Sequence, residues 1–321
     1  MAYRISKFIF ASACFCVFAV PVDGATVPES PDTIKFALLD WTGNHLTNHI
    51  AGEILTRVGY KVDYATTAQA AAWQGLSDGT LHVNAEQWLV SQKPVFEDLK
   101  AKGKVGSLGE LGLVGREAWY YPAYIAEKCP ELPDWEALKK CTDLFVTAET
   151  APKGRLLDFP AEWTPESPKW IEAFGFNLAA IPAGGEGAAI AEMKSATTRK
   201  EPLLVMFYEP HWAVGEYGFK AVELPAYDPA CVKDPAWGIN KDKTNDCYEA
   251  APEIIKVSWS GFADKWPAAA KVIEQITFTN EEQAPLIKKV DVDGQKLDAV
   301  AKEWVDNNTA KWQPWVDAAT K

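Results

Sequence analysis

The chain has 321 residues, of which 48% are hydrophobic and 24% charged, so it can bury a core as one large or two medium domains. Its 32 Lys and Arg against 44 Asp and Glu give a formal net charge of −12. This acidic balance disfavours nucleic acid and anionic membrane surfaces, because both select clusters of Lys and Arg. We therefore expect no nucleic-acid partner.

Residues 1–25 have the pattern of a secretory signal peptide. Two basic residues precede an apolar run over 8–20, and small residues follow at Gly24 and Ala25. The run is shorter than the roughly 20 apolar residues that a membrane-spanning helix needs. A lipoprotein signal through Cys14 is the weaker alternative, because the apolar run continues past that cysteine. We expect the segment to be cleaved and the mature protein to be periplasmic.

After residue 25, short apolar runs alternate with helical patterns. Strands are predicted at 34–39, 61–64 and 81–84, and helices from Asn44, over 67–76 and over 93–102. The alternation resumes with a strand from Leu144, a helix over 169–174, a strand over 178–181, a helix over 187–197 and a strand over 203–208. This pattern predicts an α/β fold with mostly parallel sheets flanked by helices.

Four cysteines follow the signal segment, and an even count in an oxidising compartment predicts disulfides. Three pairings are possible, and the simplest joins neighbours in sequence, Cys129 with Cys141 and Cys231 with Cys247. A zinc site is the competing interpretation, but the chain has no closely spaced cysteine pair and only four His.

The long polar segment 228–252 contains an oxygen-rich cluster, which could bind a structural calcium ion because Ca²⁺ prefers hard oxygen ligands. The cluster consists of Asn240, Asp242, Asn245 and Asp246. Its order is not that of an EF-hand, and a merely polar loop is the alternative.

Several aromatic residues fall at predicted strand ends, where ligands bind in open α/β sheets. Trp41 follows the first strand, Trp88 follows the third, Trp119 lies in a run of three aromatics, and Tyr208 and Trp212 flank the last strand end. Converging aromatic faces form the kind of cage that binds quaternary ammonium groups by cation–π attraction. Taken singly, each of these residues is more often ordinary core, and the interpretation rests on the set as a whole.

Three motifs carry a resemblance to a known family. The segment Tyr208-Glu209-Pro210-His211-Trp212 is similar to a W-T-P-[HY]-W motif, the strand end at Trp88 is similar to A-x-x-W, and Trp119-Tyr120-Tyr121-Pro122-Ala123-Tyr124 is similar to W-x-V-P-x-Y. With these motifs the chain resembles the extracytoplasmic substrate-binding proteins of the glycine betaine/proline betaine class of ABC transporters. It looks most like the trimethylamine N-oxide-binding branch of that family.

The resemblance implies a two-lobed periplasmic-binding-protein architecture with a two-crossover hinge. With crossovers expected near 117–121 and 208–212, lobe I comprises 26–117 and 213–321, and lobe II comprises 118–212. The resemblance also implies a monomeric, non-catalytic protein that binds a small methylated amine in an aromatic cage and passes it to a membrane permease. No resident cofactor is expected.

The charges near the expected cage bear on the ligand. The residues expected near the cage include five acids, Glu86, Glu117, Glu131, Glu149 and Glu209. A buried carboxylate would repel the carboxylate of glycine betaine, so trimethylamine N-oxide or choline is favoured. Glu131 is the candidate for the polar partner of the ligand oxygen, and a solvated acid in a loop is the alternative. The alternatives are a glycine betaine or choline binding protein, and a secreted hydrolase or lyase that uses acids such as Glu86 and Glu209.

Overall fold

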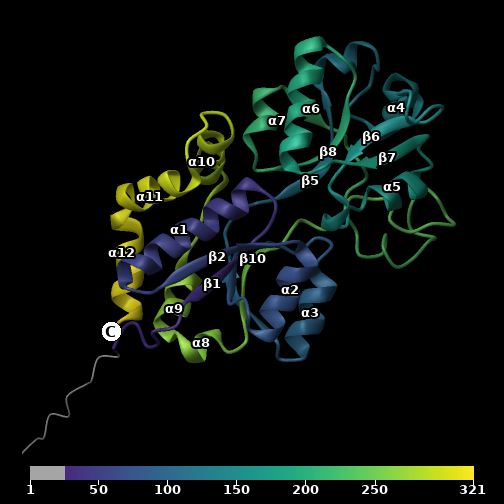
Figure 1. Ribbon diagram of the computed structural model, residues 1–321. Coiled ribbons are helices and arrows are strands. Elements are labelled where there is room, and N and C mark those ends of the chain that lie inside the picture. The colour runs from purple at the N-terminus through teal and green to yellow at the C-terminus, as the bar shows by residue number, and fades with distance from the viewer. Residues whose placement is uncertain (1–25) are drawn as a thin grey trace, which may run out of the picture.

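Two five-stranded sheets, each flanked by helices, form the two lobes of the molecule (Figure 1). The structure is a computed structural model that describes residues 26–321. The predicted signal peptide, residues 1–25, lies outside the described residues. The predicted α/β class and two-lobed architecture are confirmed.

The first sheet has the strand order β2-β1-β3-β10-β4. Strand β1 pairs in parallel with β2 and β3, whereas β10 runs antiparallel to both β3 and β4. All strands but β10 therefore point the same way, as predicted. Their bounds are β1 Ile34–Leu38, β2 Val62–Thr66, β3 Val83–Trp88, β4 Val105–Glu110 and β10 Ile254–Trp259.

The second sheet has the order β7-β6-β8-β5-β9. Strand β6 pairs in parallel with β7 and β8, and β5 runs antiparallel to β8 and β9. Here β5 is the one reversed strand, so its first residues lie beside the last residues of β8. The bounds are β5 Arg116–Pro122, β6 Gly154–Asp158, β7 Leu178–Pro182, β8 Leu204–Glu209 and β9 Phe219–Ala221.

Helices cover both sheets. Those of the first lobe are α1 Thr42–Val58, α2 Gln69–Asp78, α3 Lys93–Ala101, α8 Phe262–Lys265, α9 Pro267–Gln275, α10 Asn280–Asp291, α11 Leu297–Asn307 and α12 Thr309–Ala319. Those of the second lobe are α4 Trp135–Lys140, α5 Ser167–Phe174, α6 Glu186–Arg199 and α7 Trp212–Glu216, with 3₁₀ turns η1 Ala123–Glu127, η2 Thr142–Phe145 and η3 Ala161–Trp163. In Figure 1, α10 extends from the first lobe toward α7 of the second, and the two helices are in contact.

Strand β1 and helix α1 show how the sequence positions the site. Every residue of β1 except Lys35 is buried, as expected for a strand covered on both faces. Helix α1 begins directly after Trp41 and ends at Val58, and the next residue, Gly59, has a φ of 107° that is readily adopted only by glycine. Its first two turns bury Asn44 and Thr47, which places polar groups at the end of the first sheet.

The chain crosses between the lobes twice, as predicted, but at other positions. The first crossing is the segment 111–115 between β4 and β5, and the second is the segment 222–253 between β9 and β10. The expected crossings at 117–121 and 208–212 instead lie within β5 and at the end of β8. Strand β9 also adds residues to the second sheet that the expected boundary at 213 assigned to lobe I. The cause is that the chain returns to the second sheet once more after β8, through α7 and β9, before it crosses.

Both predicted disulfides are present. Cys129 pairs with Cys141, and Cys231 pairs with Cys247. The predicted strand from Leu144 is wrong, because Thr142–Phe145 forms a 3₁₀ turn and the strand begins at Gly154. No helix within residues 26–321 is both long and apolar enough to cross a membrane.

Candidate binding site

A cavity of about 50 Å³ lies between the lobes, where strands β3, β6 and β8 end and β5 begins. Five aromatic side chains line it from both lobes, together with polar residues of the rim. The lining comprises Trp41, Gln69, Trp88, Val90, Ser91 and Gln92 from the first lobe and Glu117, Phe159, Trp163, Thr164, Pro165, Glu166 and Tyr208 from the second. We call the five aromatic residues, Trp41, Trp88, Phe159, Trp163 and Tyr208, the cage.

The rings of the cage meet one another at steep angles. Trp41 and Trp163 have centroids 5.4 Å apart and planes at 76°, and Trp88 and Tyr208 are 5.4 Å apart at 74°. Phe159 joins these two pairs, with its centroid 5.2 Å from Trp163 and 6.4 Å from Tyr208. Because the Trp41–Trp163 and Trp88–Tyr208 pairs each take one ring from each lobe, the cage is complete only while the lobes are together.

Glu86 of β3 orients both indoles of the first lobe. The Nε1–H groups of Trp41 and Trp88 donate to its Oε1 at 2.9 and 3.2 Å. Its Oε2 accepts from the Thr47 hydroxyl at 2.7 Å and from the Gln283 amide at 2.6 Å. The residue is 1% exposed. This carboxylate thus ties α1, β3 and α10 together behind the cage.

Gly115 supports the Trp88 ring from the first crossing segment. A Cβ at this position would lie 2.7 Å from a ring carbon of Trp88, closer than side-chain contacts allow. The glycine therefore lets the crossing backbone pass directly against the indole, which limits the ring to the orientation that Glu86 also favours.

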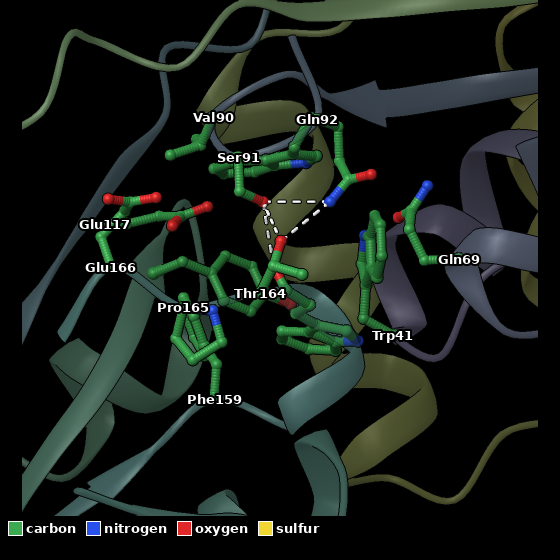
Figure 2. Close-up of a pocket in the computed structure, with 13 residues that line it drawn as sticks. Trp41, Gln69, Val90, Ser91, Gln92, Glu117, Phe159, Thr164, Pro165 and Glu166 are labelled. Atoms are coloured by element: carbon green, nitrogen blue, oxygen red, sulfur yellow. Dashed lines mark hydrogen bonds between the residues drawn. The ribbon is translucent and has the colours of Figure 1, made fainter. Parts of the chain in front are cut away.

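One side of the cavity is acidic. Figure 2 shows Glu117 and Glu166 next to one another there, with Trp41 and Gln69 at the other side. Burial raises the pKa of Glu117, and the neighbouring Glu166 and Asp158 raise it further. Burial also raises the pKa of Glu249, in the second crossing segment, and Glu117 and Glu166 add to it. The raised pKa values favour the protonated form of Glu117 and Glu249, and a protonated carboxyl can donate a hydrogen bond.

Hydrogen bonds join the two lobes at the rim of the cavity (Figure 2). The Thr164 hydroxyl donates to Oγ of Ser91 at 2.6 Å, and the Gln92 amide donates to Thr164 at 3.0 Å. The Ser91 hydroxyl in turn donates to the carbonyl of Trp163 at 3.0 Å. Ser91 and Gln92 follow β3, whereas Trp163 and Thr164 lie at η3, so the structure is the closed arrangement of the lobes.

A second polar cluster lies behind Tyr208 at the lobe boundary. The Tyr208 hydroxyl donates to Oε1 of Glu186, and the Thr42 backbone N–H of the first lobe donates to Oε2 at 2.9 Å. Burial raises the pKa of Glu186 to about 7. Nearby, Asp291 of α10 accepts from the hydroxyl of Thr42 at 2.7 Å and from Nε1 of Trp212 at 2.8 Å.

His211 completes this cluster without offering a metal ligand. Its Nε2 lies 3.6 Å from Glu186 and 3.7 Å from Asp291, so the three residues are close enough to be considered as a metal site. However, Nδ1 of His211 accepts from the Ala213 backbone N–H at 3.1 Å. Since Nδ1 is the acceptor, the neutral ring carries its proton on Nε2, and no free nitrogen faces the carboxylates. Burial lowers the pKa of His211 to about 3, which keeps the ring neutral.

The structure brings together three of the predicted ligand-binding residues, Trp41, Trp88 and Tyr208. Trp119 does not line the cavity: it is 1% exposed and packs against Trp170 and Phe176 in the core of the second lobe. Because β5 is antiparallel, the cleft lies at its first residues, and Glu117 reaches the cavity while Trp119 lies deeper.

Two other predicted site residues lie elsewhere. The Glu131 side chain is 73% exposed and lies 3.7 Å from Nζ of Lys140, away from the cavity. Trp212 packs on Tyr217 and bonds to Asp291, so it supports the lobe boundary and does not form a wall of the cage.

Sequence reasoning missed Phe159 and Trp163 as cage residues and Glu166 as a lining acid. Phe159 directly follows β6, so the rule that located Trp41 would have found it if the strand had been placed at Gly154–Asp158. Trp163 lies in a 3₁₀ turn that has no comparable sequence signal.

The predicted calcium ligands lie in the disulfide-closed loop. The Asp246 carboxylate accepts from the Asn240 backbone N–H at 2.9 Å, and the Asn240 side-chain amide donates to the Ala173 carbonyl at 2.9 Å. Asp242 and Asn245 lie in the same loop, which these bonds attach to the second lobe. Calcium binding here stays a prediction.

Residues 32–307 match the family of substrate-binding domains of ABC-type glycine betaine transport systems (OpuAC). The chain belongs to this family. As an OpuAC-type protein it is 27% identical over 294 residues to the trimethylamine N-oxide-binding protein of Pelagibacter ubique (strain HTCC1062), covering 89% of this chain and 91% of the relative. The glycine betaine/carnitine transport binding protein GbuC of Listeria monocytogenes is 23% identical over 134 residues, covering 42% of this chain and 38% of that protein.

Solved structures share the fold of this OpuAC-type protein. The glycine betaine/L-proline-binding protein ProX of Borrelia burgdorferi has a TM-score of 0.71 at 18% identity and covers 90% of this chain and 100% of its own. An ABC-transporter choline-binding protein in complex with choline has a TM-score of 0.72 at 16% identity, covering 92% and 95%. Membership of the family establishes a binding protein of a glycine betaine/choline-type ABC transporter, with a small ligand and a permease as partners.

Proposed function

We propose that this protein binds a small methylated amine, with trimethylamine N-oxide favoured, in the periplasm and delivers it to its ABC permease for import. The observation that carries the proposal is the cage, in which five aromatic side chains from both lobes surround one cavity whose polar side is acidic. Aromatic faces attract quaternary ammonium groups, each contact contributing up to about 2 kcal/mol when desolvated.

The charge of the lining supports a ligand without a carboxylate. No Lys or Arg is among the residues that line the cavity in the described chain, whereas Glu117 and Glu166 face it. The carboxylate of glycine betaine would bring a full negative charge into a poorly hydrated space that offers it no cationic partner, even with Glu117 protonated. The oxygen of trimethylamine N-oxide can instead accept a hydrogen bond from a protonated Glu117.

The size of the cavity supports the smallest candidate. A buried water needs about 10–15 Å³ of such space, so a cavity of about 50 Å³ holds only a few non-hydrogen atoms. Trimethylamine N-oxide is smaller than choline and glycine betaine. The 27% identity to a trimethylamine N-oxide-binding protein over most of the chain supports the same choice.

A calorimetric titration of the mature protein with all three compounds, at one pH and one salt concentration, tests the proposal. We expect trimethylamine N-oxide to bind about one hundredfold more tightly than glycine betaine, with choline between them. Glycine betaine binding as tightly as the others would contradict the argument from the acidic lining. Chemical conversion of any of the three during incubation would favour the hydrolase or lyase alternative.

A further inference from the structure

We propose that Glu86 is a specificity-determining residue of the cage, which selects a cationic ligand by placing an unneutralised negative charge behind two of its aromatic walls. The inference deepens the proposed function and rests on it. It concerns a residue that lines no part of the cavity and would act on the ligand through Trp41 and Trp88.

The first step of the argument is the charge of the group. Oε1 of Glu86 accepts two indole N–H bonds, and Oε2 accepts from Thr47 and Gln283. The Gln283 amide also donates to the Thr47 hydroxyl at 3.1 Å, so the hydroxyl proton is directed to Glu86. All four hydrogen bonds are therefore donated to the Glu86 oxygens, which is the pattern of a carboxylate acceptor.

The second step is that no cation neutralises this charge locally. All four hydrogen-bond donors to the Glu86 carboxylate in the described chain are neutral, two indoles, one hydroxyl and one amide. The side chain is 1% exposed, so water does not screen it effectively. A buried carboxylate without a cationic partner is unfavourable unless a positive charge arrives nearby.

The third step links this charge to the ligand. A carboxylate that accepts the N–H of an indole polarises the ring, which makes its face more negative and strengthens cation–π attraction. Because Trp41 and Trp88 both donate to the same oxygen, two walls of the cage are affected together. A methylated ammonium in the cavity would therefore supply the positive charge that the Glu86 site lacks.

The experiment compares a cation with its neutral isostere. Choline and 3,3-dimethylbutan-1-ol have the same shape, but only choline carries a charge, so a purely structural role of Glu86 would affect both equally. We expect Glu86→Gln to weaken choline binding at least tenfold, equivalent to about 1.4 kcal/mol, and to weaken binding of the alcohol less than threefold. An equal loss for both compounds, or no loss for choline, would overturn the proposal.

A second variant addresses the hydrogen bonds that Glu86→Gln disturbs, because the new amide would face the donating Gln283 amide. In Glu86→Gln/Gln283→Glu the two side chains are exchanged, so hydrogen-bond donors and acceptors match again. The negative charge then lies at position 283, one hydrogen bond farther from the indoles. We expect this double variant to unfold at the temperature of the unmodified protein and to regain part of the lost choline affinity. If the double variant folds but regains no choline affinity, the proposed role of the negative charge is wrong. This comparison does not depend on the neutral alcohol, so it holds even if the alcohol binds too weakly to measure.

The outcome for the unmodified protein separates the two proposals. If it binds none of the methylated amines, the proposed function fails regardless of Glu86. If the unmodified protein binds choline, but Glu86→Gln weakens choline and the neutral alcohol equally, only the inference about Glu86 fails.

Discussion

Trp41 of the first lobe and Trp163 of the second meet edge to face, with ring centroids 5.4 Å apart. Neither lobe alone provides this corner of the cage. A ligand that contacts both rings could do so only in the closed arrangement, so we expect ligand binding and lobe closure to be coupled at this position.

Trp163 is the cage residue whose removal should be most selective for binding. It is half-buried in a 3₁₀ turn at the lobe boundary, so Trp163→Ala removes a wall without emptying a core. We expect affinity for trimethylamine N-oxide to fall at least tenfold, in line with about 1–2 kcal/mol for a lost aromatic contact. Calorimetry measures the affinity and thermal unfolding the fold. Unchanged affinity would remove Trp163 from the cage.

Trp119 should behave in the opposite way. It is fully buried, and its Nε1 donates to the Ser167 hydroxyl at 2.9 Å. We expect Trp119→Ala to lower the free energy of unfolding by about 3–5 kcal/mol, as for other large core truncations. Glu131→Ala, at an exposed position, is the matched control and should change it by less than about 0.5 kcal/mol. Urea unfolding of both variants measures the difference.

The bond between Thr164 and Ser91 should stabilise the closed arrangement. Thr164→Val removes the hydroxyl that bonds to Ser91 and Gln92, each bond contributing about 0.5–1.5 kcal/mol. We expect affinity to fall about three- to tenfold, and small-angle scattering to report a more open average shape without ligand. Thr198→Val, on the exposed face of α6, is the control. Equal effects of the two substitutions would rule out a specific role of the rim.

Glu186 should make ligand binding dependent on pH. Its pKa is raised to about 7 in the closed, buried arrangement, against about 4.3 for an exposed Glu. Closure therefore takes up a proton, so its contribution is fully present below about pH 4 and is lost as the pH rises through 7. If opening exposes Glu186, affinity should fall about tenfold between pH 6 and pH 8.

Glu186→Gln tests this dependence directly. The raised pKa of Glu117 acts in the same direction, so the unmodified protein reports the sum of both groups. We expect the variant to have a flatter pH profile, with the difference between the two profiles assigned to Glu186. A variant with the same slope as the unmodified protein would show that Glu186 does not titrate on closure.

The sequence predicted those parts of the fold and site that depend on local pattern. Trp41 and Trp88, which the structure places in the cavity lining, were predictable as strand-end residues because Trp41 follows β1 and Trp88 ends β3, two parallel strands with clear apolar runs. Trp119 was misplaced because the rule about carboxyl ends of strands reverses for an antiparallel strand, and strand direction is not visible in the local pattern. Glu131 was misplaced because the loop that carries it is fixed by Cys129–Cys141 on the outer surface of the second lobe.

Trp163 and Thr164 could not be predicted for a different reason. Their position at the cavity depends on how one lobe rests on the other, and the contacts that decide this, such as Ser91 with Thr164, are separated by more than 70 residues in the chain. The pattern of apolar and polar residues along the sequence predicts local elements and does not predict a contact between residues so far apart in the chain.

Both disulfides stabilise the second lobe, one within it and one in the crossing segment that bonds to α5 through Asn240. The two halves of the cage therefore differ in their dependence on the redox state of their surroundings. Before oxidation, Trp41 and Trp88 stand on a lobe without disulfides, whereas Phe159, Trp163 and Tyr208 stand on a lobe that lacks its cross-links. A chain with reduced cysteines would therefore carry Phe159, Trp163 and Tyr208 on a lobe without its covalent cross-links, and we expect it to bind ligand more weakly than the oxidised protein.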